Sequence, residues 1–102
     1  MTEQTVSVYQ FSLADNTQED EFLSVSAKSD TFLKKQKGFQ YRSLSKIDDN
    51  SWLDIVYWSD LASAQQANAA FEKDEDCKRF MSMLNMDSIK MQKAYIVSQV
   101  MA

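Results

Sequence analysis

Arg42 and Asp54 are the two side chains of this sequence whose types and positions point most directly to chemistry. Each stands inside a predicted strand rather than in a loop, and Asp54 lies among apolar residues. A guanidinium fixed in a strand can recognise a substrate carboxylate or enolate, and a carboxylate in apolar surroundings can have a perturbed pKa. The simpler interpretation is an ion pair across a hairpin, which contributes about 0.2–1 kcal/mol.

Aromatic residues supply the next candidates. Trp58, which ends a predicted strand, either closes the core or forms a pocket wall that stacks on a flat ligand or donates an indole hydrogen bond to it. Tyr9, Tyr41 and Tyr57 belong to the core or an interface, unless one of them presents its hydroxyl to a ligand. Trp52, at the other end of the same strand, is expected at a dimer interface or at the closure of a barrel.

Methionines gather near the C-terminus, at positions 81, 83, 86 and 91. Flexible thioether side chains commonly fill irregular gaps in a core. The alternative is an adaptable lining at the mouth of a pocket for an apolar ligand, with Met83 as the candidate residue. A copper site lacks the supporting ligands that this spacing would need.

Absent residue types exclude several classes of enzyme. The chain has no histidine and only one glycine. A Ser-His-Asp triad, a histidine zinc site, a haem with a proximal histidine and a glycine-rich phosphate loop are therefore excluded. The single Cys77 cannot form a disulfide within the chain and has no metal-binding neighbours. We expect no metal and no cofactor.

Charge and hydropathy limit the classes of partner that we expect. A net charge of −4 disfavours nucleic acid, and the lysines at positions 34, 35 and 37 are better explained by a helix C-terminus. No run approaches the roughly 20 apolar residues of a membrane helix, and the N-terminal residues do not resemble a signal peptide. The expected protein is cytoplasmic, with neither a nucleic-acid nor a membrane partner.

Hydrophobic periodicity predicts one domain of alternating strands and helices. Strands are expected at residues 5–13, 39–47, 52–59 and 89–100. Thr17 and Asp20 have the spacing of a capping pair before a first helix, which Gly38 should end in a left-handed conformation. Ser59 or Asp60 is expected to cap a second helix, and Asp76 a short third one.

This order predicts an α+β, ferredoxin-like fold, strand–helix–strand–strand–helix–strand, with a short extra helix before the last strand. Two right-handed crossovers place both main helices on one face of an antiparallel sheet. The central strands carry apolar residues on both faces, so the other face also needs a cover. A chain of 102 residues has no layer left for it. We therefore infer a homodimer through the sheet face.

The run from Lys37 to Ala64 resembles the antibiotic biosynthesis monooxygenase-like proteins of the dimeric α+β barrel superfamily. The shared features are a glycine followed by an aromatic residue, a hairpin, a tryptophan at the end of the third strand, a Ser/Asp cap and an alanine-bearing helix. Here these are Gly38-Phe39, Tyr41 to Trp52, Trp58, Ser59-Asp60, and Ala62 and Ala64.

The resemblance implies two sheets packed face to face as a barrel, with a small-molecule cavity between the helices and the sheet of each protomer. Some members of the superfamily oxygenate aromatic substrates without metal or flavin, and others have no known activity. Haem-degrading members use a histidine on the second helix, and this chain has none. By position, the resemblance assigns Trp58 to the cavity.

Two functions follow as hypotheses. The first is a homodimeric, non-catalytic barrel that binds a small apolar or aromatic ligand. The alternative is a cofactor-independent monooxygenase that acts on a phenolic or enolic aromatic substrate. The candidate pocket residues are the same for both: Trp58, Tyr9, Tyr41, Tyr57, Arg42, Asp54 and Met83.

Overall fold

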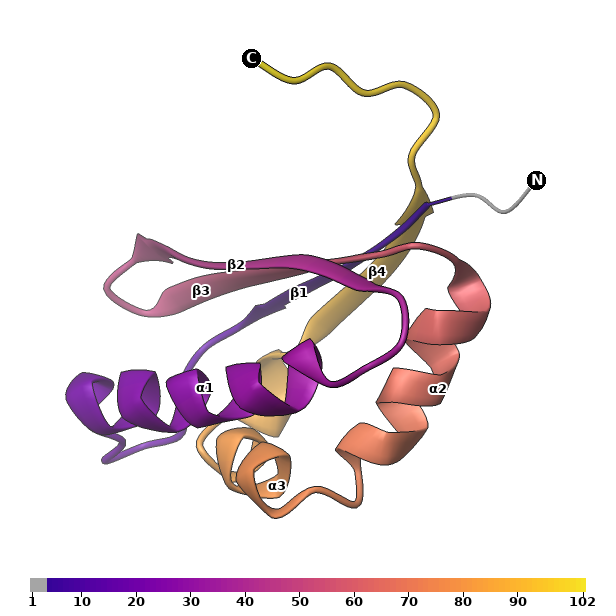
Figure 1. The fold of residues 1–102 in the computed structure, drawn as a ribbon. Coiled ribbons are helices and arrows are strands. Elements are labelled where there is room, and N and C mark those ends of the chain that lie inside the picture. Colours follow the sequence, from indigo (N-terminus) through magenta and orange to yellow (C-terminus); the bar gives the residue numbers. More distant parts are fainter. Residues whose placement is uncertain (1–3) are drawn as a thin grey trace.

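The chain forms a four-stranded antiparallel sheet with its helices on one side (Figure 1). The structure, a computed structural model, describes residues 4–102. In chain order the elements are β1 (Thr5–Phe11), α1 (Glu19–Lys34), β2 (Phe39–Asp48), β3 (Ser51–Trp58), α2 (Leu61–Phe71), α3 (Glu75–Ser82), the short 3-10 helix η1 (Met86–Ser88) and β4 (Lys90–Tyr95). The strand order is β2-β3-β1-β4, so the predicted ferredoxin-like fold is confirmed.

Strand register assigns every side chain of the sheet to one of two faces. β1 pairs with β3 from Thr5 opposite Trp58 to Phe11 opposite Trp52, and opposed residues share a face. The helix-facing side carries the buried residues Thr5, Ser7, Phe11, Trp52, Asp54, Val56 and Trp58. The other side, called the open face below, carries the half-buried residues Val6, Val8, Leu53, Ile55 and Tyr57. The open face is thus apolar in the central strands, as the sequence predicted.

The core consists of two clusters, one at each end of β3. Trp52 packs with Phe22 of α1, with ring centroids 5.1 Å apart, and Phe22 stacks on Phe80 of α3 at 5.3 Å. Trp58 packs at the other end with Leu33 of α1 and with the small side chains of α2. The two tryptophans therefore join β3 to opposite ends of α1, Trp52 together with α3 and Trp58 together with α2.

β4 is an edge strand, and all of its residues are exposed. It is shorter than predicted, because the strand ends at Tyr95. One further backbone hydrogen bond follows, in which Ile96 N donates to Gln4 O at 2.9 Å. Among the described residues, its neighbour β1 begins at Thr5, which is opposite Tyr95. β1 itself ends at Phe11, two residues earlier than predicted.

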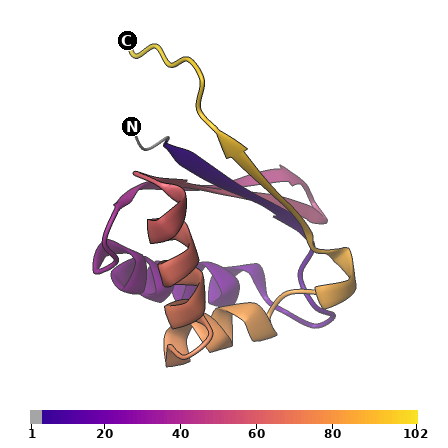
Figure 2. The ribbon, with the colours of Figure 1, turned by 90° about the vertical axis from the view of Figure 1, so that its right-hand side faces the viewer.

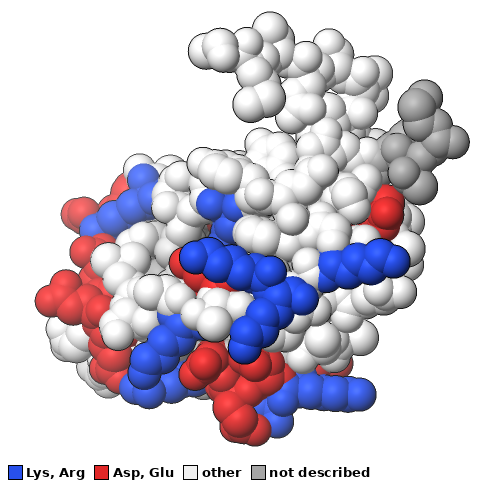
Figure 3. All heavy atoms as spheres, in the orientation of Figure 1, with Lys and Arg blue, Asp and Glu red and all other residues white. Residues whose placement is uncertain are grey.

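Residues 97–102 extend away from the sheet as a C-terminal tail (Figures 1 and 2). Val97 is 96% exposed, Val100 95% and Met101 84%. The tail has no charged side chain, whereas charges of both signs cover the surface around α1 and α3 (Figure 3). It is the most exposed apolar segment of the described chain.

The helix starts differ in part from the predictions. α1 has Gln18 at its N-cap with no side-chain hydrogen bond, so the predicted Thr17–Asp20 capping pair is wrong. α2 is capped by Asp60, whose carboxylate accepts from Ser63 N at 2.7 Å. α3 is capped by Asp74 rather than by Asp76, because the extended backbone that an N-cap needs lies directly after the turn that follows α2.

Gly38 has a φ of +83°, in the left-handed region that the sequence predicted. It does not cap the helix, which ends at Lys34, but lies in the turn 36–39. Its carbonyl accepts from Ser59 N at 2.8 Å and so joins the start of β2 to the end of β3. A Cβ here would lie 2.7 Å from Ser59 Oγ and closer still to Ser63. Both the conformation and the close packing require glycine.

Candidate functional site

Arg42 is the centre of a buried polar network between the sheet and α1. Its Nε and Nη2 donate to the two carboxylate oxygens of Asp54 at 2.9 and 2.7 Å. Its Nη1 donates to Asp30 Oδ1 at 2.7 Å and to Ser29 Oγ at 3.2 Å. Only 7% of the Arg42 side chain and 8% of that of Asp54 are exposed. The predicted cross-strand ion pair is confirmed.

The environment of Arg42 favours its charged form. Burial alone would lower the pKa of Arg42, but the hydrogen bonds and charges of Asp54 and then Asp30 outweigh burial and raise it. The guanidinium also lies over the ring of Phe80, 5.3 Å from its centroid. Recognition of a substrate carboxylate would require the forked bond to Asp54 to open. The geometry therefore favours the structural interpretation of Arg42 and Asp54.

Ser7 and Tyr9 place hydroxyl groups on the helix-facing side of β1. Ser7 is 1% exposed, and its buried Oγ has no hydrogen-bond partner among the described residues. Burial raises the pKa of Tyr9, the neighbouring Ser7 hydroxyl lowers it, and the charge of Asp54 raises it. The Ser7 and Tyr9 hydroxyls are therefore close neighbours, but Ser7 Oγ makes no regular hydrogen bond to a described residue. Ser7 retains an unused donor and acceptor in the interior.

Three residues of β4 lie on the same side of the sheet, next to this pair. Met91 is opposite Tyr9, Lys93 is opposite Ser7, and Tyr95 is opposite Thr5. We call Met91, Lys93 and Tyr95 the β4 row. Met91 is 55% exposed and Tyr95 50%, and Lys93 is exposed as well. The helices cover the neighbouring strands β1 and β3 but leave the β4 row uncovered.

Trp58 and Met83 are buried at opposite ends of the interior. Trp58 is 3% exposed and packs edge-to-face on Phe39, with ring centroids 5.8 Å apart. Met83, 8% exposed, belongs to the other cluster, with Phe22 and Trp52. Trp58 and Met83 belong to different core clusters, and their roles in a ligand site stay predictions.

Tyr41 and Tyr57 project from the open face, away from the helices. Their rings pack on each other with centroids 5.7 Å apart, and Tyr41 is 59% exposed. The six candidates that belong to strands are thus divided between the two faces of the sheet, and Met83 lies at the end of α3. The prediction for Trp52 was wrong: this residue is 5% exposed within the core of its own chain, because its position in β3 shares the helix-facing side with Trp58.

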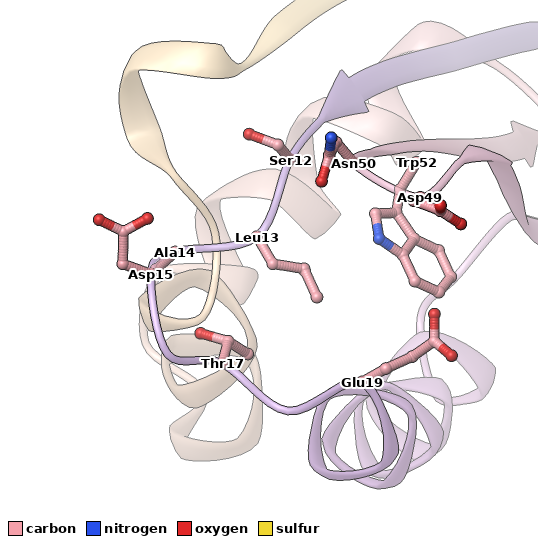
Figure 4. Close-up of a pocket in the computed structure, with 9 residues that line it drawn as sticks. All are labelled: Ser12, Leu13, Ala14, Asp15, Thr17, Glu19, Asp49, Asn50 and Trp52. Atoms are coloured by element: carbon pink, nitrogen blue, oxygen red, sulfur yellow. The ribbon is translucent and has the colours of Figure 1, made fainter.

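An open depression of about 280 Å³ lies at the Trp52 end of the sheet (Figure 4). Its lining comes from the β1–α1 loop, the first turn of α1 and the β2–β3 turn: Ser12, Leu13, Ala14, Asp15, Thr17, Glu19, Asp49, Asn50 and Trp52. The carboxylates do not converge, since Asp15 points away from the other two acids (Figure 4). Lys46 already pairs with Glu19 at 2.6 Å and lies 5.7 Å from the Trp52 ring centroid.

Cys77 is buried and free. Burial and then the Asp74 carboxylate raise the pKa of its thiol to about 12. The thiol is therefore neutral at physiological pH and is not an activated nucleophile.

Neither a metal site nor a membrane-spanning helix is present among residues 4–102. No group of three or more acidic or cysteine side chains in this range could hold a metal ion, and none of the described helices is long and apolar enough to span a membrane.

Sequence reasoning missed Ser7 and Lys93. The alternation of β1 places Ser7 beside Tyr9 on one phase, which is a usable signal. Lys93 gives no such signal, because its place opposite Ser7 depends on the register between the first and last strands.

No family profile matches this sequence, and no curated protein sequence is similar to it. Solved structures share its fold over nearly the whole chain. A variant of SnoaB from Streptomyces nogalater, described as a cofactor-independent oxygenase, has a TM-score of 0.77 at 20% identity, with 96% of this chain and 97% of that chain covered.

Two further structures extend this likeness. NE2512 from Nitrosomonas europaea, a protein of unknown function, has a TM-score of 0.72 at 11% identity, with coverage of 99% and 96%. A putative antibiotic biosynthesis monooxygenase from Chloroflexus aurantiacus has a TM-score of 0.69 at 7% identity, with coverage of 95% and 96%. The chain therefore has the ferredoxin-like fold of the antibiotic biosynthesis monooxygenase-like proteins, as the resemblance implied.

Proposed function

We propose that the protein is a homodimer that binds a small aromatic ligand against the helix-facing side of β1 and β4. The observation that carries the binding proposal is the buried Ser7 hydroxyl, which has no partner among the described residues. Its directly paired neighbours on this face are the buried Val56 and the exposed Lys93, so a ligand would approach from the β4 side.

The energetic cost of burying the Ser7 hydroxyl without a hydrogen bond favours a ligand that supplies one. A buried polar group without a hydrogen bond costs about 1–3 kcal/mol, and a ligand oxygen that bonds to it would recover part of that cost. Met91 and Tyr95 offer an adaptable thioether and an aromatic ring within the same row. One polar contact beside an uncovered apolar and aromatic surface suits a flat ligand with a hydroxyl or carbonyl group.

Tyr9 fits the same role. Because burial raises its pKa, its phenol stays protonated at physiological pH and can donate a hydrogen bond. Asp54, which is opposite Tyr9 on β3, is not free to contact a ligand, because it is hydrogen-bonded to Arg42. In this arrangement Ser7 and Tyr9 of β1 orient the ligand, and the Arg42–Asp54 ion pair joins β2 to β3, the strand next to β1.

The open face supports the homodimer. Its central strands present Val6, Val8, Leu53 and Ile55, which are only half-buried in a single chain. Covering such a surface with a second copy removes apolar area from water, at about 25 cal/mol per Å². The exposed apolar tail adds further surface that a second copy could bury. Sedimentation equilibrium should give a dimer at micromolar concentration, and a monomer there would contradict this part of the proposal.

Ligand binding is tested by thermal-shift screening of the full chain against phenols, naphthols and quinones. We expect at least one of these classes of compound to raise the midpoint temperature of thermal unfolding. Ser7→Val should reduce this rise in temperature while leaving the fold intact. Ser45→Val, on the open face of β2, is the matched control and should keep the full shift. The binding proposal fails if no compound stabilises the protein, or if both valine variants behave alike.

The second candidate function is cofactor-independent oxygenation, favoured by the structural likeness to SnoaB. An anthrone would become an anthraquinone, with one atom of O₂ forming the new carbonyl and the other leaving as water. Such chemistry needs a base for the substrate, and Asp54, the buried carboxylate on this side of β3, is already paired with Arg42. An oxygen electrode tests this function with anthrone or hydroquinone as the substrate. Oxygen consumption that depends on the protein supports oxygenation, and no such consumption leaves ligand binding as the function.

A further inference from the structure

We infer that the ligand of this site is an anion, and that Lys93 is the residue that recognises its charge. The inference rests on the proposed function, and it adds the charge class of the ligand. Lys93 projects from β4 on the helix-facing side, directly opposite Ser7. No acid among residues 4–102 forms an ion pair with it, although five other ion pairs are present there.

Lys93 differs from the other two lysines of the sheet in its combination of face and partners. Lys46, also on the helix-facing side, is paired with Glu19 at 2.6 Å. Lys90 and Gln92, the alternate residues of β4, project from the open side. Lys93 is therefore a cation without an acidic partner on the side where the interior begins, next to a hydroxyl without a hydrogen-bond partner.

These two groups suit one kind of ligand atom. Opposed residues of an antiparallel pair have Cα atoms roughly 4.5–5.5 Å apart, so a serine hydroxyl and a lysine ammonium on one face can reach the same anionic oxygen. A carboxylate, sulfonate or phenolate oxygen accepts from both, and hydrogen bonds to charged groups are stronger than those between neutral groups. Tyr95 and Met91 flank Lys93 in the same row and would contact the attached ring. The ligand class is an aromatic anion.

Two probes with one skeleton test this inference. 8-Anilinonaphthalene-1-sulfonate is anionic, and N-phenyl-1-naphthylamine is its neutral counterpart. Fluorescence titration of the full chain should show tighter binding of the sulfonate, on the order of tenfold. Lys93→Gln should remove this preference by weakening the binding of the sulfonate.

Lys90→Gln makes the same charge change on the opposite side of the same strand and is the matched control. It should keep the preference for the sulfonate. Equal binding of both probes to the parent chain, or equal effects of the two glutamine variants, overturns the role of Lys93 and leaves the aromatic site in place. Binding of neither probe overturns both proposals. Circular dichroism of each variant confirms that the exposed substitutions preserve the fold.

Discussion

Replacing Arg42 with alanine is the sharpest test of how this fold is held together. The substitution removes the forked bonds to Asp54 at 2.7 and 2.9 Å and leaves that carboxylate, only 8% exposed, without its cation. Removal of one partner of a buried ion pair costs about 3–5 kcal/mol. The whole domain is expected to be stable by about 5–15 kcal/mol, so the loss is a large fraction of the total.

Asp30 supplies an internal comparison. It binds the same guanidinium at 2.7 Å, but 48% of its side chain is exposed. Water can therefore solvate either partner when the bond is lost, and Asp30→Ala should cost at most about 1 kcal/mol. Arg42→Lys should fall between the two, since one ammonium cannot reproduce the fork to Asp54.

Urea unfolding followed by tryptophan fluorescence measures these losses, because Trp52 and Trp58 report on both core clusters. The double variant Arg42→Met/Asp54→Leu removes both charges and should be much closer to the parent chain than Arg42→Ala is. The reasoning is refuted if Arg42→Ala costs less than about 1 kcal/mol, or if Asp30→Ala costs as much as Arg42→Ala.

Four further outcomes are expected. Gly38→Ala should destabilise the domain by about 2–5 kcal/mol in urea unfolding, from the left-handed φ and from overpacking against α2; Lys37→Ala in the same turn should have little effect, and equal effects would contradict this account. Ser7→Ala should stabilise the ligand-free chain by about 1 kcal/mol and weaken aromatic binding, and a loss of stability would mean that Ser7 has a partner. Because the pKa of Cys77 rises from 9.0 to about 12 on folding, its contribution to stability is present below about pH 9 and lost as the pH rises to about 12; Cys77→Ala should lose this pH dependence, and iodoacetamide should label the parent rapidly only in urea. A chain that ends at Ile96 lacks the exposed apolar tail and should dimerise more weakly in sedimentation equilibrium, and an unchanged dissociation constant would exclude a role for the tail.

The sequence predicted the fold because its signals are local. Alternating residues mark β3, acidic caps mark α2 and α3, and Gly38 marks a left-handed turn. The errors have local causes too. Asp74 and Asp76 are equally good caps by type, and only the backbone at the end of the preceding turn separates them. The last strand was predicted too long, because apolar residues continue along the chain after β4 ends at Tyr95.

The candidate site was harder to predict than the fold. Arg42 and Asp54 could be paired from the sequence, because a hairpin brings its two strands together over a short separation. Trp52 was misplaced, although its spacing from Trp58 puts both on one face. The sequence does not say which face of a strand meets the helices when both faces are apolar. The structure places Tyr41 and Tyr57 on the open face.

The sequence by itself determined the order of elements, the absence of histidine chemistry and the pairing of Arg42 with Asp54. Each depends on residue types or on contacts between neighbouring strands. Only the tertiary structure decided that Ser7 is buried without a partner and that Lys93 lies opposite it. The reason is that β1 and β4 are separated by almost the whole chain, and their register is fixed by the packing of everything between them.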